Sequence, residues 1–422
     1  MKDIEYFPDG KPIDDWFYQV EPPKLKDLGK EYLVTDYGIS DDGRLYTQEI
    51  QDLIDRIYME GGGVLVIPYG TYRTGALFFK QGVHLHIQQG GVLKGSDDIY
   101  DYPILPTRIE GENCTYFSAL INANGLKKFV ISGEGIIDGS GELSWRSFWL
   151  RKKWNASCTN KDEQRARLVY ISNCTDVTIC GIHMQNSQFW TNHLYHCERV
   201  KYLNCKIFSP YAPIKAPSTD GIDIDVCKDV LIKNCHLSVA DDAVVLKGGK
   251  GPWADTKAEN GANERVLIED CFFGECAACL TCGSESIYNR NVLMRRIQTE
   301  NAGRLLWLKM RPDTPQCYEY ITVEQVQGSL LYFLYITPWT QFYDLKDRKE
   351  IPISFASHIR LQNSRIVCTK FFNAVEEKTQ YRLLDFYLKD LDIVAKENGF
   401  CERIIDGITV ENVVVSLEDN GS

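Results

Sequence analysis

Apolar and polar residues alternate in a phrase that recurs along most of the chain. The phrase is an aliphatic pair, then Asn or Asp, then a small or thiol-bearing residue, and clear copies begin at Val200, Val230 and Val266. Copies that begin at residues 177, 200, 230, 266, 292 and 321 lie 23 to 36 residues apart. Alternation with a period of two is typical of a β-strand. Short strands that repeat at this interval, with no amphipathic helices between them, predict a coil of stacked strands.

Two other repeat folds fit this pattern less well. A leucine-rich horseshoe has its own Leu and Asn spacing, which is missing, and a propeller needs more of the Asn-Gly and Asp-Gly pairs that make antiparallel hairpins. The pattern therefore favours an all-β parallel β-helix that spans residues 1–422 as one domain. In such a coil Asn204 and Asn234 are expected to stack at a turn, and Cys205 and Cys235 to stack in the interior.

The two ends of the chain depart from the repeat. Residues 47–58 have helical spacing of apolar residues, and Gly61, Gly62 and Gly63 would stop a helix there. We expect residues 1–60 to form an N-terminal extension with a capping helix that closes the coil. Residues 381–396 are a second helical candidate, within a C-terminal insertion over about residues 371–403.

Composition and charge narrow the possible partners. The chain is 44% hydrophobic and 25% charged, with a net charge of −11, which argues against nucleic acid because phosphate binding needs a basic face. No stretch is apolar for long enough to span a bilayer, so no membrane partner is expected. Residues 1–14 are polar and show no signal-peptide core. Aromatic residues reach 12%, which suits a thick core or a sugar-binding cleft.

The 15 cysteines do not have the spacing of a disulfide scaffold. Cys276, Cys279 and Cys282 lie at three-residue steps, which is compatible with a zinc site. Cysteine is also among the most buried residue types, so a core ladder is the preferred interpretation. We expect no metal and no cofactor.

The candidate chemistry is a dense polar stretch inside this hydrophobic repeat. Residues 218–225 read STDGIDID, and Asp220 and Asp241 lie 21 residues apart, close to one coil, which corresponds to a strand spacing of about 4.8 Å. Spacing alone thus predicts carboxylates on adjacent rungs of one face, with basic groups beyond them. The residues expected on or near this face are Asp220, Asp241, Asp242, Lys247, Glu285, Arg304, Lys309 and Arg311.

Clustered carboxylates are what the hydrolysis of a glycosidic bond requires. One carboxyl group donates a proton to the leaving oxygen while another activates water, and crowding raises the pKa of the acid. Asp223 and Asp225 alternate with isoleucines, so a cleft role and a simple outward-facing role both remain open for them. Strict alternation would separate Asp241 from Asp242, and both reach one cleft only if the chain bends there.

These motifs, with several others, resemble glycoside hydrolase family 28, the polygalacturonase family. The likeness covers nearly the whole chain and extends to the segments 36–38, 61–64, 68–75, 133–139 and 186–191. Ser218-Thr219-Asp220 is similar to the family's Asn-Thr-Asp, and Asp241-Asp242 to its paired aspartates. The resemblance implies a right-handed parallel β-helix and an inverting, cofactor-free hydrolase that removes galacturonic acid from pectic polysaccharide or oligosaccharide.

The resemblance also implies roles for individual residues. Asp241 would be the general acid, and Asp220 with Asp242 would hold the attacking water. Lys247, the loop from residue 248 to residue 263, and Gly283-Ser284-Glu285 resemble the bacterial exo-acting members. Asp223, Glu285, Arg304, Trp307, Lys309 and Arg311 complete the expected substrate-binding set together with Lys247.

Two family motifs are altered in this chain. The family's Gly-His-Gly falls near Ala277-Ala278-Cys279, so its histidine is missing. Its Arg-Ile-Lys is similar to Trp307-Leu308-Lys309, so the lysine is kept and the arginine is not. Arg304 or Arg311 is a possible substitute. A neutral sugar beside the cleaved bond would need no bidentate carboxylate clamp and would stack on Trp307, so a rhamnogalacturonan-directed galacturonohydrolase stays open as an alternative.

Other classes of protein also fit a solenoid. A pectate-lyase-type β-eliminase would need calcium and an arginine base, and a non-catalytic carbohydrate-binding solenoid would have no use for mutually repelling acids. The substrate class favours a periplasmic or secreted setting, while the cysteines leave the cytoplasm open. The sequence does not predict an oligomeric state.

Overall fold

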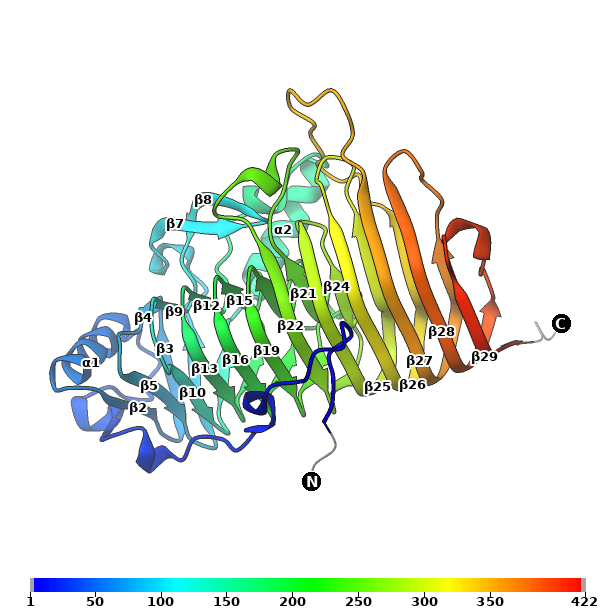
Figure 1. Ribbon diagram of the computed structural model, residues 1–422. Coiled ribbons are helices and arrows are strands. Elements are labelled where there is room, and N and C mark those ends of the chain that lie inside the picture. The colour runs from blue at the N-terminus through cyan, green and yellow to red at the C-terminus, as the bar shows by residue number, and fades with distance from the viewer. Residues whose placement is uncertain (1–3, 419–422) are drawn as a thin grey trace.

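The computed structural model describes residues 4–418, which form one long right-handed coil of parallel strands (Figure 1). Each coil contributes one strand to each of three faces, and each strand pairs in parallel with its counterpart in the next coil. The predicted all-β parallel β-helix is confirmed. The first face consists of β1 (Glu31–Leu33), β2 (Gly63–Ile67), β5 (Val83–Ile87), β10 (Val130–Gly133), β13 (Thr175–Cys180), β16 (Glu198–Leu203), β19 (Lys228–Lys233) and β22 (Ala262–Glu269).

The other two faces follow the same order. The second consists of β3 (Gly70–Thr74), β6 (Gly91–Gly95), β11 (Ile136–Asp138), β14 (His183–Gln185), β17 (Lys206–Phe208), β20 (His236–Ser238) and β23 (Phe272–Phe273). The third, which carries the candidate site, consists of β4 (Leu77–Phe78), β9 (Ile121–Asn124), β12 (Val169–Ser172), β15 (Asn192–Tyr195), β18 (Ile222–Asp225), β21 (Val244–Lys247) and β24 (Leu280–Cys282).

Toward the C-terminus the three short strands of each coil merge into one long strand that bends around the coil. These strands are β25 (Tyr288–Met310), β26 (Cys317–Pro338), β27 (Ser354–Ala374), β28 (Tyr381–Glu397) and β29 (Thr409–Leu417). Short 3-10 helices punctuate the turns at Asp15–Tyr18, Leu25–Asp27, Val34–Tyr37, Ile99–Asp101, Asn160–Asp162, Ala254–Thr256 and Glu402–Ile404.

The helix α1 (Thr47–Met59) lies at the N-terminal end of the coil, as predicted (Figure 1). Its residues Ile50, Leu53, Ile54 and Ile57 are buried against the first coil, which would otherwise expose its core. The chain then turns through glycines that a side chain would obstruct. A Cβ on Gly62, whose φ is 104°, would lie 2.7 Å from the carbonyl oxygen of Gly82.

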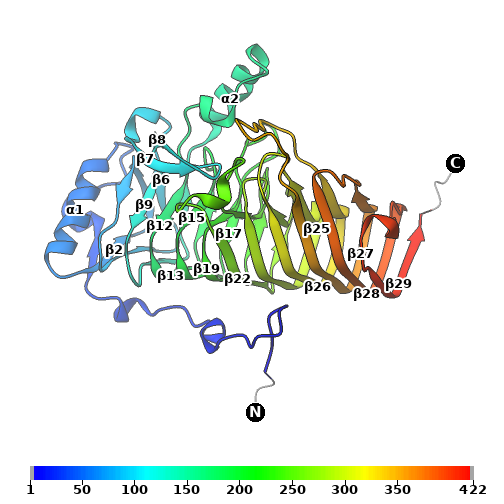
Figure 2. The same cartoon turned by 45° about the horizontal axis from the view of Figure 1, so that its top comes forward.

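The N-terminal segment runs along the outside of the first face rather than into the coil (Figure 2). Phe7, Ile13 and Phe17 are buried there against an outward-facing apolar stripe. That stripe is made of one residue from each of five successive rungs, Cys180, Leu203, Leu231, Leu267 and Leu293. Within residues 4–418, no helix is long and apolar enough to cross a membrane.

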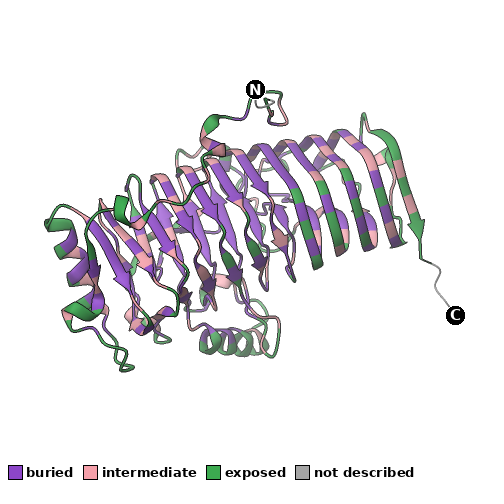
Figure 3. Ribbon diagram, turned by 90° about the horizontal axis from the view of Figure 1, so that it is seen from below, coloured by how far each residue is buried: buried purple, intermediate pink, exposed green. Residues whose placement is uncertain are grey.

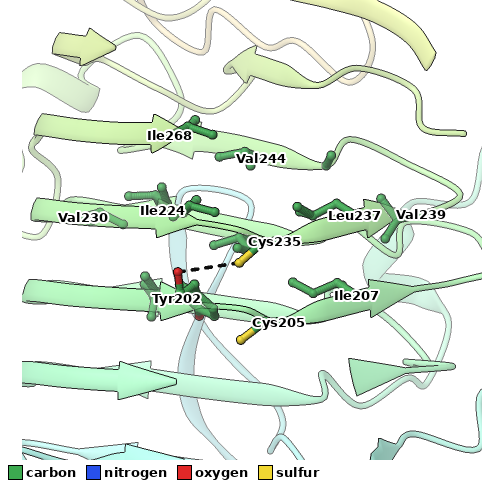
Figure 4. Close-up of a cluster of buried hydrophobic side chains, with 14 of the residues drawn as sticks. Tyr202, Cys205, Ile207, Ile224, Val230, Cys235, Leu237, Val239, Val244 and Ile268 are labelled. Atoms are coloured by element: carbon green, nitrogen blue, oxygen red, sulfur yellow. Dashed lines mark hydrogen bonds between the residues drawn. The ribbon is translucent and has the colours of Figure 1, made fainter. Parts of the chain in front are cut away.

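Buried residues recur along the coil, while the last strand, β29, has none (Figure 3). Asn204 and Asn234 occupy equivalent corners with φ of 56° and 53°, a left-handed conformation that asparagine tolerates. Cys205 and Cys235 follow them and point inward, where the Cys235 thiol donates to the carbonyl oxygen of Tyr202 at 3.6 Å (Figure 4). Both predicted ladders are present. Cys276, Cys279 and Cys282 are likewise buried in the hydrophobic core.

The predicted helix at residues 381–396 is wrong, because β28 (Tyr381–Glu397) is an extended strand of a regular coil. Its apolar residues lie two apart along each straight section and three apart at the corners. The corners are Asp385 and Asp390, whose φ values are 51° and 50°. Mixed gaps of two and three residues imitate the 3.6-residue period of a helix.

Four insertions stand above the third face (Figure 1). The antiparallel hairpin β7–β8 (Ile104–Ile109 and Glu112–Phe117) precedes β9, and α2 (Glu142–Trp154) precedes β12. The other two are the loops 248–261 and 339–353, which contact each other where Trp253 Nε1 donates to Asp347 at 3.0 Å.

Candidate active site

A pocket of about 250 Å³ opens above the third face, between β18, β21 and the four insertions. Three of its lining residues are the predicted aspartates Asp220, Asp241 and Asp242. Asp220 lies two residues before β18, and Asp241 and Asp242 lie just before β21, so all three sit where the chain enters the third face. The Gly221 amide donates to the carbonyl oxygen of Asp242 at 2.9 Å, which places the two segments on adjacent rungs.

Both members of the Asp241-Asp242 pair face this pocket. They lie in the turn before β21 rather than in the strand, so strict alternation does not apply to them. The Asp242 amide donates to Asp241 Oδ1 at 3.0 Å, which fixes one oxygen of Asp241 and leaves the other toward the pocket. The bend that the sequence required for a shared cleft is therefore present.

The pKa values of two pocket carboxyls are displaced upward. Burial raises the pKa of Asp220 well above its usual range, and the charges of Asp223 and Asp241 raise it further. Burial, followed by the charge of Asp242, raises the pKa of Asp241. Crowded carboxyls of this kind share protons as a set, so the pocket retains protons where isolated aspartates would have lost them.

Two lysines supply the opposite charge. Lys309 Nζ lies 2.5 Å from Asp242 Oδ2. Lys247 Nζ lies 3.1 Å from Glu285, 3.7 Å from Asp223 and 3.8 Å from Asp220. Burial alone would raise the pKa of Glu285, but the charges of Lys247 and Arg311 hold it below its usual value. Glu285 is thus an anchor for Lys247 in the wall of the pocket.

The predicted substrate-binding residues fall into two groups. Lys247, Glu285, Lys309 and Arg311 line the pocket. Arg311 is committed elsewhere, because its guanidinium makes two hydrogen bonds of 2.7 Å with Asp313 and donates to two backbone carbonyls of the loop 339–353. It holds that loop in place.

Asp223, Arg304 and Trp307 are not among the lining residues. Asp223 lies below the pocket, where burial raises its pKa to about 7 against the opposing charge of Lys247. Arg304 and Trp307 belong to a neighbouring aromatic cluster with Tyr332, Tyr335 and Trp339. Arg304 lies 3.9 Å from the Trp307 ring centre and 4.3 Å from that of Tyr335. Trp339 connects this cluster to the pocket, which it also lines.

A second buried network adjoins the pocket on its N-terminal side. Asp225, two residues beyond Asp223 on β18, accepts a hydrogen bond of 2.7 Å from Arg108 of the hairpin. Burial would raise the pKa of Asp225, but Arg108 and His193 outweigh it and lower the pKa. Arg108 also donates to Asn260 of the loop 248–261 at 2.8 Å. The hairpin is therefore fixed across the third face as a wall.

The histidine of this network is neutral. Burial lowers the pKa of His193 to about 4, and its Nδ1 lies 2.7 Å from Arg167 Nη1, so Nδ1 accepts. Its Nε2 then donates toward Asp225 at 3.4 Å. Arg167 itself is fully buried and donates to Thr107 of the hairpin at 2.6 Å.

Sequence reasoning assigned no role to the pocket residues that lie outside the strands. These are Glu110 of the hairpin, Phe148, Trp149 and Lys152 of α2, Lys250, Trp339 and Phe342 of the two loops, and Trp190 and Lys215 of the turns before β15 and β18. None belongs to the strand repeat, so spacing carried no information about them. The one available signal was the composition of α2, where tryptophans and basic residues are crowded into ELSWRSFWLRKKW. Within residues 4–418, no group of three or more His, Cys, Asp or Glu is placed to hold a metal ion.

The fold and the pocket define a right-handed parallel β-helix with a carboxylate-lined cleft on one face. Residues 105–292 match the sequence model described as "Glycosyl hydrolases family 28". The match contains all three pocket aspartates. The fold and the family match thus agree with the expectation from the motifs.

Curated proteins of similar sequence are named as a polygalacturonase or a galacturonosidase. A protein of Vitis vinifera named "Probable polygalacturonase" is 29% identical over 246 residues, which cover 56% of this chain and 47% of that protein. An "Exo-poly-alpha-D-galacturonosidase" of Dickeya chrysanthemi is 33% identical over 139 residues, which cover 31% of this chain and 21% of the relative. The chain thus spans about half the length of the grape protein and about a fifth of the bacterial one.

Solved structures agree in fold. The exopolygalacturonase of Thermotoga maritima, described as hyperthermoactive, superposes with a TM-score of 0.72 at 22% identity, over 95% of both chains. The polygalacturonase of Erwinia carotovora superposes with a TM-score of 0.70 at 19% identity, over 94% of this chain and 98% of that one. At these identities the likeness is one of architecture.

Proposed function

We propose that the protein is an exo-acting glycoside hydrolase that releases galacturonic acid from α-linked galacturonides by an inverting acid/base mechanism. The observation that carries the proposal is the convergence of Asp220, Asp241 and Asp242 in one pocket that is closed on its N-terminal side. A pectic substrate of this kind is met outside the cytoplasm, so a periplasmic or secreted location accompanies the proposal.

The roles of the aspartates follow from their surroundings. Asp241 is the general acid, because burial and the neighbouring Asp242 raise its pKa and keep a proton available. Asp242 is the general base, and the ammonium of Lys309 lies 2.5 Å from its Oδ2. Asp220, one rung away, holds the attacking water together with Asp242. The base removes a proton from water as the acid protonates the leaving oxygen, so the anomeric configuration inverts.

Exo action is supported by the wall on the N-terminal side. The third face continues past β18 to β15, β12 and β9, which would lengthen an open cleft. The hairpin β7–β8 crosses this surface and is fixed by the buried ion pair of Arg108 with Asp225. The loop 248–261 contributes Asn260 to the same closure. A polymer would therefore enter by its end.

Recognition of a uronate is supported by cations that face the pocket without a carboxylate of their own. Lys215 is exposed at the pocket, and within the described residues no carboxylate lies at ion-pair distance from it. Lys152 donates to the carbonyl oxygen of Cys158 and likewise has no acidic partner in that part of the chain. On a protein of net charge −11, two such lysines form a local site for a carboxylate.

A second candidate is a rhamnogalacturonan-directed galacturonohydrolase. The aromatic cluster favours it, because Trp307, Tyr335 and Trp339 offer stacking surfaces beside the pocket, where a neutral sugar would bind. The same cluster carries Arg304, which would also attract a uronate.

Product analysis on polygalacturonan beside rhamnogalacturonan oligosaccharides tests these proposals. We expect monomeric galacturonic acid from the first minutes, with the inverted anomer visible by proton NMR. Mixed oligomers at early times would overturn exo action, and a retained anomer would overturn the inverting mechanism. A chelator-sensitive rise in ultraviolet absorbance would indicate a lyase. The absence of turnover on every pectic substrate would indicate a binding solenoid.

A further inference from the structure

The helix α2 is anchored to the coil by one face only. Trp145 and Phe148 are buried, and the Trp145 indole donates to the carbonyl oxygen of Ser187 at 2.9 Å. Phe148 lies under the guanidinium of Arg165, 4.6 Å from the ring centre. These contacts hold the helix in position beside the pocket, and large side chains on its opposite face are exposed.

That opposite face combines apolar and basic side chains, and the helix projects from the body of the protein (Figure 2). Leu143, Leu150 and Trp154 are 56%, 51% and 81% exposed. Together with Arg146 and Lys153 they form one stripe along the helix. The spacings from Leu143 to Trp154 are three, four, three and one residues. We call these five residues the outer face of α2. Exposed apolar side chains gathered in this way mark a binding surface.

The charge of α2 is opposite to that of the whole chain. The helix has four basic residues and one acidic residue in a protein of net charge −11. Arg146 pairs with Glu142 at 2.6 Å and Arg151 with Glu163 at 2.7 Å. Within residues 4–418, no carboxylate lies at ion-pair distance from Lys153. Its ammonium is available to an anionic ligand.

The helix α2 contributes residues both to the outer face and to the pocket. Trp149 and Lys152, which line the pocket, lie within one turn of Leu150 and Lys153. A chain bound on the outer face would thus be led toward the aspartates. A lipid surface on the same residues would instead cover the mouth of the pocket.

We propose that the outer face of α2 is a docking site for anionic polysaccharide, separate from the pocket, which holds a stretch of polyuronate while the chain end reacts. Sugar rings stack on Trp154 and Leu150, and the ring carboxylates face Lys153 and Arg146. This site rests on the proposed function and extends it. It raises the local concentration of chain ends at the pocket, so it acts on polymers and has no effect on substrates too short to reach it.

The test is the double variant Lys153→Gln/Trp154→Ala, assayed on long polygalacturonate and on digalacturonate. Neither residue lines the pocket. We expect KM for the polymer to rise about threefold to tenfold, since single exposed contacts are individually weak. Both kcat and the kinetics on digalacturonate should stay unchanged. The salt dependence of the polymer KM should also be weaker in the variant.

Two further variants control this experiment. Lys127→Gln/Tyr69→Ala removes one exposed cation and one aromatic ring that is 82% exposed, away from α2, and should behave as wild type. Lys153→Arg/Trp154→Phe keeps the charge and the ring and should restore the polymer KM. An unchanged polymer KM in the first variant overturns the docking site. The docking site is also overturned if the Lys153→Gln/Trp154→Ala variant keeps the wild-type polymer KM but no longer binds anionic phospholipid vesicles, or if it keeps that KM but no longer forms a dimer.

Binding without turnover separates this proposal from the proposed function. Retardation of the wild-type protein in gels that contain polygalacturonate measures docking directly. If neither substrate is cleaved but the wild type is retarded and the Lys153→Gln/Trp154→Ala variant is not, the hydrolase assignment fails and the docking site stands. Equal retardation of both proteins overturns the docking site.

Discussion

Two carboxylates on the same strand show opposite behaviour. Asp223 and Asp225 lie two residues apart on β18, and both are fully buried. The pKa of Asp223 rises to about 7, whereas the pKa of Asp225 falls below its usual value. The difference is the distance to a cation, because Arg108 lies 2.7 Å from Asp225 and Lys247 lies 3.7 Å from Asp223.

This contrast extends to the two regions that the aspartates belong to. The region around Asp225 pairs its charges closely and holds the wall of the pocket. The region around Asp220 and Asp241 crowds like charges together and leaves protons to be exchanged. Like-charged groups in a buried site lower the free energy of unfolding, but they shift pKa values in a way that acid/base catalysis can use. Breaking a close, hydrogen-bonded ion pair in a buried site destabilises the fold. Substitutions in the first region should therefore affect folding, and substitutions in the second should affect activity.

The largest effect should come from Asp241→Asn in the crowded region. An amide keeps the shape of the side chain but delivers no proton, so we expect kcat to fall about 10²- to 10⁴-fold. The free energy of unfolding should stay the same or rise, because one of the repelling charges is removed. Steady-state kinetics and denaturant unfolding measure the two quantities. The acid assignment is falsified if the variant keeps more than about a tenth of wild-type kcat.

The next largest effect should come from Arg108→Met in the paired region. The substitution leaves the carboxylate of Asp225 buried without its closest partner, and we expect a loss of about 3–5 kcal/mol in the free energy of unfolding. The double variant Arg108→Met/Asp225→Asn should recover part of this loss, because no unpaired charge remains. Urea denaturation measures both. A loss below about 1 kcal/mol in the single variant would show that the ion pair does not hold the hairpin.

Lys309→Met tests the ion pair of Lys309 with Asp242 inside the crowded region. The side chain keeps most of its stem while its charge is lost, and loss of a charged hydrogen bond costs about 1.5–3 kcal/mol. That is roughly one to two decades in kcat/KM. Because the partner of Lys309 is Asp242, kcat should fall on uronate and neutral-neighbour substrates alike. A rise in KM confined to the uronate substrate would assign Lys309 to the substrate instead.

The smallest effect should be a pH shift in Asp223→Asn. The anion of Asp223 raises the pKa of Asp220, second only to burial, so its removal lowers that pKa. Asp220 holds the attacking water as a carboxylate, and a group with a raised pKa becomes a carboxylate only as the pH rises through that value. The acidic limb of the kcat/KM profile should therefore move to lower pH in the variant. An unmoved limb would mean that Asp223 is uncoupled from the reacting groups.

The fold and the positions of the pocket aspartates were predictable because both are local in the repeat. Period-two alternation and a regular coil length determine which residues stack, so Asp220 and Asp241 were placed one coil apart before any coordinates. The capping helix was equally predictable, since Ile50, Leu53, Ile54 and Ile57 have helical spacing. The same reasoning failed at β28, where Asp385 and Asp390 turn the strand and produce gaps that resemble a helix.

The sequence by itself thus determined the coil, its core ladders and the row of acids, because each depends on spacing along the chain. Only the tertiary structure decided how the pocket is closed and what each charge does. Arg108 meets Asp225 across 117 residues and Lys309 meets Asp242 across 67, and no periodicity relates such positions. The insertion that supplies Lys152 and the outer face of α2 lies outside the repeat, and Lys215 lies in the turn between β17 and β18. A side chain's pKa depends on its distance to the nearest charges in a buried site, and that distance exists only in the folded chain.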